Sequence, residues 1–361
     1  MSVVVAARRT WIGVTGRGHR GVDETALAAA VLTATARDAG VDDVDDVVLG
    51  NAAGHGGNVA RRAALAAGLT APGLTVDRQC ASGLAAIAVG AALVDSGQAD
   101  AVLAGGVESG SHAPRRSHGP LAYGRASFAP PPWADPDLGD AADRLARARG
   151  TARERQHAWA VRSHERVRTA HAAGRFAAET VPVGGLRRDE HARRLDPRVL
   201  DRLPGAFGAD GSVTALSAAP SGDGAAAVAV VPDGSPGLRV RAAVTCGTDP
   251  SRPMVGPVAA VRTACARAGV ALGDVAAVEL VEAFAVQALA VTEELGADDA
   301  RWNTDGGTLG LGHPFGASGA VAVVRLYARL VTAGAPAGTL GLATAAAAGG
   351  LGVALLVEVV R

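Results

Sequence analysis

Two stretches of the chain repeat one pattern, CASGLAAIAVGAALVDSG at residues 80–97 and GASGAVAVVRLYARLVTAG at residues 316–334. Each begins with small residues that favour a turn and continues as an apolar helix. An apolar strand follows each helix, ADAVLAGGVES after the first and GTLGLATAAAAGG after the second. Repetition of a whole helix–strand unit predicts that the chain consists of two similar halves.

A second pair of similar segments supports this prediction. Residues 26–51 and residues 258–282 both run from a helix through a glycine turn to an apolar strand. Helices that alternate with buried apolar strands are typical of parallel or mixed sheets covered by helices. We therefore expect two α/β halves, each with strand, helix, strand, helix and strand in the same order.

The composition excludes several classes of protein. The 361 residues include 35 basic and 35 acidic side chains, and every basic residue is arginine because no lysine occurs. Schiff-base enzymes, P-loop nucleotide-binding proteins and protein kinases all need a lysine. The zero net charge argues against a nucleic-acid partner, which requires a basic excess.

The cysteines and the apolar segments indicate a location. Cys80, Cys246 and Cys265 form no metal-binding pattern, and three sparse cysteines suit a reducing compartment. No apolar run long enough for a membrane span lacks a helix breaker, and the apolar N-terminus precedes its basic residues, the reverse of a signal peptide. We expect a cytoplasmic protein with no membrane partner and no metal site, in which Cys246 and Cys265 belong to the core.

The middle of the chain differs from both halves. Residues 111–210 are rich in proline and arginine and contain a charged, amphipathic helical stretch from about Asp140 to Gly174. Such a segment is expected to form a lid over a site on the core. The predicted domains are a first half (1–110 and 211–235), a loop domain (111–210) and a second half (236–361).

Cys80 and His313 are the candidate catalytic residues. Cys80 follows a short strand at about Leu74–Val76 and stands where a helix begins, so the helix dipole is expected to lower its pKa. His313 lies among glycines in NTDGGTLGLGHPFGASGA, directly before the helix of the second half. Taken singly, each pattern also fits a buried structural residue. If the halves pack with twofold pseudosymmetry, both helix starts face one cleft, and a Cys–His pair there suits covalent acyl transfer.

At these motifs the chain resembles the thiolase family nearly from end to end. RQCASGLAAIA resembles the motif of the nucleophilic cysteine, GGTLGLGHPFGASGA the histidine motif, VEAFA the NEAFA motif, and RSHERVRTAHAAGRFAAETVPV the loop domain. The resemblance implies two similar mixed five-stranded sheets with buried helices in αβαβα layers, plus a loop domain. It also implies a coenzyme A thioester as substrate, no tightly bound cofactor and a homodimer or a tetramer. The stretch from Arg115 to Asp137 looks shorter than the tetramerisation loop, which favours the dimer.

The same resemblance implies roles for individual residues. Cys80 would accept the acyl group, His313 would activate it, and the backbone N–H groups of Cys80 and Ala348 would form an oxyanion hole. Arg193 is the candidate contact for the adenine end of coenzyme A. The remaining substrate-binding candidates are the pantetheine contacts Ala283 and Phe284, the acyl-end contacts Leu138 and Met254, and Phe315.

The departures from the family affect the second half of the thiolase reaction. Val281 stands where the family has the NEAF asparagine, which holds the water of another oxyanion hole. Ala346 stands where the family has the cysteine that removes the α-proton of the second thioester. The family motif that corresponds to Thr214–Ala219 ends in a serine that contacts coenzyme A, and here that last position is Ala219. Losing one oxyanion donor costs about 2.7–4 kcal/mol and losing a general base about 10²–10⁴-fold in rate.

Three hypotheses follow. In the first, acyl-Cys80 forms from an acyl-CoA, ordinary Claisen and thiolysis activity is weak or lost, and the acyl group passes to an acceptor that needs no carbanion, such as an amine or alcohol. In the second, the protein is a decarboxylative carbon–carbon condensing enzyme. In the third, it is a non-catalytic protein with a coenzyme A site, or a partner subunit.

Overall fold

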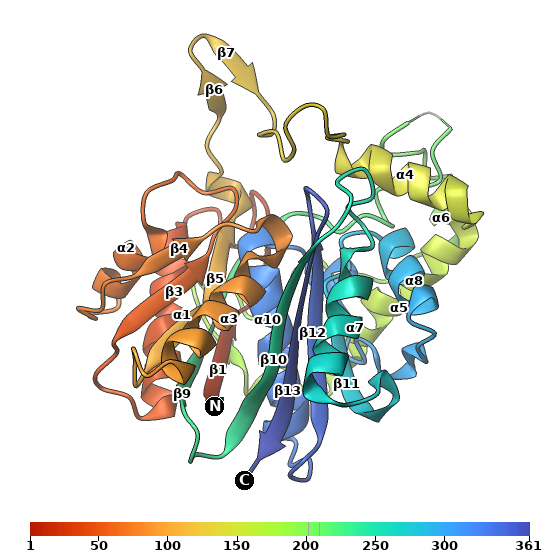
Figure 1. Ribbon diagram of the computed structural model, residues 1–361. Coiled ribbons are helices and arrows are strands. Elements are labelled where there is room, and N and C mark those ends of the chain that lie inside the picture. Colours follow the sequence, from red (N-terminus) through yellow and green to blue (C-terminus); the bar gives the residue numbers. More distant parts are fainter. Residues whose placement is uncertain (201, 209) are drawn as a thin grey trace.

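The computed structural model describes residues 1–200, 202–208 and 210–361. Its main feature is one large mixed sheet to which both halves contribute (Figure 1). The first half supplies, in spatial order, β4 (Leu74–Val76), β3 (Asp46–Gly50), β5 (Val102–Ser109), β9 (Gly222–Pro232) and β1 (Ser2–Thr10). The second half continues with β10 (Gly237–Gly247), β13 (Leu351–Val360), β12 (Leu340–Ala347) and β11 (Val275–Leu280).

The two halves have the same topology. In each half one parallel pair, β3 with β5 or β11 with β12, is followed towards the junction by two antiparallel pairings. In the first half β4 pairs in parallel with the outer side of β3. The halves join where Val3 pairs with Arg239 and Val4 with Leu238. The described residues give the second half four named strands, and an isolated parallel bridge from Val278 to Trp302 takes the place of the fifth. The predicted thiolase-type α/β fold is confirmed, with this difference in the fifth strand and with the halves joined edge to edge.

The outer helices cover the faces of the sheet. Helices α1 (Glu24–Ala39) and α2 (Val59–Ala66) pack on the first half, and α7 (Gly256–Ala268) packs on the second, where α8 (Ala285–Glu294) lies beyond it. Asp23 caps α1 by accepting a hydrogen bond from Ala26 N, and Gly40 ends it at φ 64°, a conformation that suits glycine.

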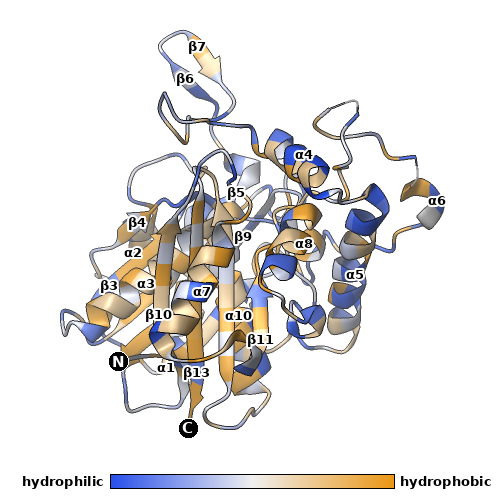
Figure 2. Cartoon of the chain, turned by 45° about the vertical axis from the view of Figure 1, so that its right-hand side comes forward, coloured by the Kyte–Doolittle hydropathy of each residue, from blue (hydrophilic) through white to orange (hydrophobic). Residues whose placement is uncertain are grey.

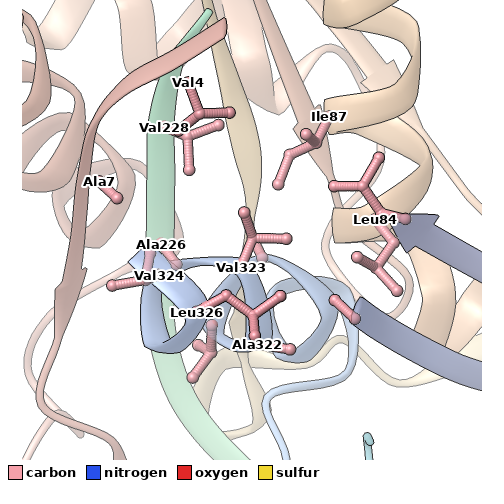
Figure 3. Packing of buried hydrophobic residues seen from close by; sticks show 14 of the residues in the cluster. Val4, Ala7, Leu84, Ile87, Ala226, Val228, Ala322, Val323, Val324 and Leu326 are labelled. Carbon is pink, nitrogen blue, oxygen red and sulfur yellow. The ribbon is translucent and has the colours of Figure 1, made fainter. Parts of the chain in front are cut away.

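The central helices are α3 (Ser82–Asp95) and α10 (Phe315–Tyr327), which belong to the two repeated stretches. Both are apolar on nearly all sides, which is typical of helices buried in a core. Figure 3 shows Ile87 of α3 and Val323 of α10 projecting into the space beside Val4 and Val228 of the sheet, and Leu84 of α3 belongs to the same buried cluster.

Glycine lets the two helices touch. A Cβ on Gly83 would lie 2.7 Å from Ala320 N, and one on Gly319 would lie 2.8 Å from Leu84 N. The apolar helical segment Phe315–Thr332, which adds the π-turn Ala328–Thr332 to α10, is long enough to cross a membrane by length and composition, but 67% of it is buried. It is therefore the core helix of this fold.

The loop region lies at one end of the sheet (Figure 1). It contains the hairpin of β6 (Arg116–His118) and β7 (Leu121–Tyr123), the helices α4 (Leu138–Arg149) and α5 (Arg153–Ala172), and the short α6 (Pro197–Leu200). The predicted helical stretch from about Asp140 to Gly174 contains these two helices, α4 and α5, because Gly150 adopts φ 61° and ends α4. Figure 2 shows α5 as mostly hydrophilic and the strands of the sheet as mostly hydrophobic.

Short elements complete the chain. They are β2 (Gly13–Val14), β8 (Thr180–Val181), α9 (Thr308–Leu311) and the 3₁₀ turns η1 (Gln79–Ala81), η2 (Gly110–His112), η3 (Leu272–Asp274) and η4 (Asp299–Arg301). Cys265 is buried in α7 and belongs to the core as predicted, whereas Cys246 in β10 is half-buried and packs against the edge of the same cluster.

Candidate active site

Cys80 lies in the turn η1, between β4 and the start of α3, as the sequence predicts. Ser82 fixes this turn, because its hydroxyl accepts a hydrogen bond from Arg78 N (2.8 Å) and donates one to Gln79 O (2.7 Å). Gln79 adopts φ 53°, an uncommon conformation for a residue with a side chain. Backbone strain immediately before the cysteine shows that the fold determines the position of its sulfur.

The prediction that the pKa of Cys80 is lowered is wrong in direction. Burial raises the pKa of the thiol to about 12, and the negative charge of Glu108 adds to the rise. The N–H group of Cys80 itself opposes this effect only in part. In the free protein Cys80 is therefore a thiol, and forming a nucleophile requires removal of its proton.

His313 is placed as a proton acceptor. Its Nδ1 lies 2.7 Å from Ser318 Oγ, and that hydroxyl donates its only hydrogen to Pro314 O at 2.9 Å. Nδ1 must therefore carry the imidazole proton, which leaves the lone pair on Nε2. Nε2 is buried and has no hydrogen-bond partner among the described residues. Burial lowers the pKa of His313 to about 4, so the imidazole is neutral at neutral pH.

The structure brings the segments of both candidates together. The turn η1, which contains Cys80, packs against α10, whose first residue is two positions after His313, and against β12. The β12 strand ends one residue before Ala348. The N–H group of Ala348 donates no hydrogen bond to any described residue, which leaves it available for a ligand. The two helix starts therefore meet at one place, as the pseudosymmetry predicts.

Buried apolar side chains occupy the two positions at which the chain lacks the family's asparagine and second cysteine. Val281 follows β11 and is 2% exposed, and Ala346 lies near the end of β12 and is 6% exposed. Glu282, the nearest acid in sequence to Val281, accepts hydrogen bonds from Trp159 Nε1, Ser163 Oγ and Asn303 Nδ2, which occupy its carboxylate. The carboxylate of Glu282 is therefore already engaged by these three donors.

Four of the predicted substrate-binding residues come together in one cluster. Met254 and Phe284 are buried in it, and Leu138 and Ala283 pack against it. Phe207, which the sequence reasoning missed, packs edge-on against Phe284 at 5.8 Å between ring centroids. The cluster places the start of α4 beside the residues that follow β11, where loop region and second half meet.

The other two predicted contacts lie elsewhere. Phe315 stacks edge-on against His313 at 4.9 Å and lines a cavity of about 520 Å³ with Gln79 and Phe128. Arg193 is exposed, and its backbone N–H group donates to His164 Nδ1 at 3.4 Å.

The sequence reasoning also missed Glu108, Asn51 and Ser318. Glu108 is buried at the end of β5, and burial raises the pKa of its carboxyl to about 7. Its position in AGGVESGS at the end of an apolar strand was the available signal. Ser318, in the GASG motif, was identified only as part of a helix start.

Comparison with known proteins gives a consistent result over the whole chain. Residues 2–234 match the family model of the thiolase N-terminal domain, and residues 235–359 match that of the thiolase C-terminal domain. A relative named putative acetyl-CoA C-acetyltransferase YhfS, from Bacillus subtilis, is 37% identical over 99% of both chains. An acetyl-CoA acetyltransferase of Pseudomonas aeruginosa is 38% identical over 98% of both chains.

Solved structures agree. The crystal structure of the Bacillus anthracis acetyl-CoA acetyltransferase has a TM-score of 0.92 and 33% identity, and it covers 99% of this chain and 98% of its own. The Acat5 thiolase of Ascaris suum, solved in complex with coenzyme A, has a TM-score of 0.90 and 29% identity, and the match covers 99% of this chain and 100% of the Acat5 chain. The chain belongs to the thiolase family and is an enzyme of the thiolase type.

Proposed function

We propose that this protein is an acyltransferase that forms an acyl-Cys80 intermediate from an acyl-CoA thioester. Cys80 Sγ attacks the thioester carbonyl while its proton passes to Nε2 of His313. The C–S bond to coenzyme A then breaks, and the departing thiolate takes that proton and leaves as free coenzyme A. The N–H groups of Cys80 and Ala348 would stabilise the oxyanion between these events.

The unpartnered Nε2 of neutral His313 is the observation that supports this step. With a thiol pKa of about 12, Cys80 needs a base, and a neutral buried imidazole with a free lone pair provides one. The fixed tautomer means that the ring needs no rearrangement before it accepts the proton.

The second half-reaction is proposed to differ from that of an ordinary thiolase. A Claisen condensation needs a base for the α-proton and a donor for the enolate oxygen, and Val281 and Ala346 can supply neither. We therefore propose that thiolysis and condensation are weak or lost. The acyl group passes instead to an acceptor that attacks with its own lone pair, such as an amine or alcohol.

The substrate and the setting are part of the same proposal. Relatives named acetyl-CoA acetyltransferase and a structural neighbour solved with coenzyme A support an acyl-CoA substrate. The Leu138–Phe284 cluster is proposed to contact its pantetheine and acyl parts, with Phe315 as a further substrate contact and Arg193 at the adenine end of coenzyme A. We propose a cytoplasmic homodimer.

Intact-mass measurement of the purified protein with acetyl-CoA tests the proposal. The expected result is an acetyl adduct that Cys80→Ala abolishes and His313→Ala slows. Release of CO2 from malonyl-CoA would instead favour the decarboxylative condensing enzyme. Absence of an adduct from any acyl-CoA, together with absence of coenzyme A binding, would leave a non-catalytic protein or partner subunit.

A further inference from the structure

Glu108 is a buried carboxylate that four N–H donors surround. Its Oε1 accepts hydrogen bonds from Asn51 Nδ2 and Ala53 N, both at 3.1 Å. Its Oε2 accepts from Ala52 N at 3.0 Å and from Gly316 N at 2.9 Å. With only 1% of its surface exposed, Glu108 relies on these donors in place of water.

These donors belong to different halves of the molecule. Asn51 to Ala53 follow β3 of the first half, whereas Gly316 lies in the first turn of α10 of the second half. The start of α10 packs tightly against the segment that follows β3, because a Cβ on Gly316 would lie only 2.7 Å from Asn51 Cα. A carboxylate at the N-terminus of a helix is also favourable to the helix dipole. Glu108 thus connects the first half to the segment that begins with His313.

The repeat gives this contact a counterpart at Cys80. The motifs CASG and GASG equate Cys80 with Gly316. The parallel ladder of the first half ends where Gly50 pairs with Gly106, and that of the second half ends where Leu280 pairs with Thr344. Glu108 lies two residues beyond Gly106 and Ala346 lies two residues beyond Thr344, so the two positions correspond. By the same register Asn51 corresponds to Val281. The polar Asn51–Glu108 pair remains in the first half, and an apolar pair occupies the equivalent place beside Cys80.

We propose that Glu108 is a positioning residue for the acylation step: its carboxylate holds the start of α10, and so His313, in place opposite Cys80. The inference rests on the proposed acyl-Cys80 chemistry for its catalytic consequence, but its structural part can be measured separately.

The position of Glu108 gives it two opposite effects on Cys80. Its negative charge disfavours the thiolate, while its hydrogen bonds hold the base that removes the thiol proton. Other charges near this pair are Glu24, which acts on Glu108, and Asp77, which acts on Cys80. Arg116 also approaches, since its Nη2 donates to Ala52 O at 3.0 Å. Replacing a residue with a purely structural role would change thiolate formation and acylation in the same direction, whereas replacing Glu108 should make the thiolate easier to form and acylation slower.

The test compares Glu108→Gln and Glu108→Asp with the wild-type protein at pH 8.5, where Glu108 is ionised. Glu279→Gln is the matched control, because it neutralises another buried carboxyl, which lies on β11 and pairs with Arg329. Three readouts are hydrogen–deuterium exchange of the peptide His313–Ala320, the pH profile of Cys80 alkylation by iodoacetamide, and the single-turnover rate of acetylation by acetyl-CoA.

For Glu108→Gln we expect the Gly316 amide to exchange about tenfold faster, because a hydrogen bond to a charged group is lost. Alkylation should begin at lower pH, while acetylation falls about 10- to 100-fold through misplacement of His313. Glu108→Asp keeps the charge, so its alkylation profile should match the wild type while exchange still increases. This variant decides the outcome if Glu108→Gln does not fold.

Unchanged exchange in His313–Ala320 would overturn the inference. So would a parallel fall of alkylation and acetylation, or the same changes in Glu279→Gln. If the wild-type protein forms no acyl-enzyme, the proposed function fails, and exchange and alkylation still decide whether Glu108 positions this segment.

Discussion

Nδ1 of His313 lies 2.7 Å from the hydroxyl of Ser318, whose own hydrogen is donated to Pro314 O. This arrangement fixes the imidazole tautomer with the lone pair on Nε2. Ser318 is four residues from Pro314 in the first turn of α10, so the helix itself sets the orientation of the ring.

Replacing Ser318 by alanine tests this relationship. Ser318→Ala should slow acetylation of Cys80 about 10- to 100-fold, because the tautomer is no longer fixed. The loss of a buried hydrogen bond should cost about 1 kcal/mol of stability. Thr292→Val is the matched control, since it removes another buried hydroxyl that bonds to its own helix. A similar loss of acetylation in both variants would contradict the role of Ser318.

The reactivity of free Cys80 follows from its pKa of about 12. Alkylation by iodoacetamide should rise with pH without reaching a plateau below about pH 10, and at pH 7 only about 1 in 10⁵ molecules should carry the thiolate. The measurement is the alkylation rate by mass spectrometry from pH 6 to 11. A plateau near neutral pH would show that the helix N-terminus outweighs burial.

The buried histidines should make stability depend on acidity. Burial lowers the pKa values of His164 and His313 to about 4, from an ordinary value of 6.5. As the pH falls, each histidine takes up a proton at about pH 6.5 in the unfolded chain but only at about pH 4 in the folded protein. Proton binding therefore favours the unfolded chain, so the free energy of unfolding is highest above pH 6.5 and decreases between pH 6.5 and 4. The change is on the order of 3 kcal/mol per histidine.

Urea denaturation across this pH range tests the prediction. His164→Gln should flatten the dependence, whereas the exposed His118→Gln should leave it unchanged. Equal slopes in the wild type and His164→Gln would show that His164 does not titrate differently in the folded protein.

Introducing the family's asparagine at position 281 and its cysteine at position 346 should restore part of the ordinary thiolase reaction. Val281→Asn with Ala346→Cys is expected to raise acetoacetyl-CoA thiolysis by at least about 10²-fold, since each group supplies that much in other enzymes. Val281→Asn with Ala345→Cys is the control, because neighbouring residues of a strand point to opposite faces. No gain over this control would show that the surrounding pocket has also diverged.

The contact between α3 and α10 should be sensitive to a single methyl group. Gly83→Ala would place a Cβ 2.7 Å from Ala320 N and 2.9 Å from Gly316 O, both backbone atoms that cannot move aside cheaply. We expect a loss of about 1–3 kcal/mol, seen as a lower urea midpoint. Gly273→Ala, where a Cβ meets nothing within 4 Å, should be neutral.

The repeat made the fold predictable from sequence. Each repeated stretch carries its own turn, helix and strand, so local pattern alone identified β4, α3, β5, α10 and β12. The break at Gly150 was missed because a glycine inside a charged helical pattern can either continue or end a helix.

The site was only partly predictable. Cys80 and His313 stand in recognisable motifs. Leu138, Met254, Ala283 and Phe284 lie in one cluster, and their contact with the substrate stays a prediction. The direction of the Cys80 pKa depends on burial and on Glu108, which comes from a strand 28 residues further along. Local sequence marks Glu108 as a polar residue at the end of an apolar strand, but it does not show which distant segments the carboxylate contacts, so the role of Glu108 emerged only from the structure.

The most direct test of the central claim follows both half-reactions in one sample. Wild-type protein is mixed with acetyl-CoA, and acetyl-Cys80 is measured by intact mass while acetoacetyl-CoA is measured in the same solution. We expect coenzyme A to be released and acetyl-Cys80 to accumulate, with little or no acetoacetyl-CoA. Rapid turnover to acetoacetyl-CoA, with no accumulation of acetyl-Cys80, would contradict it.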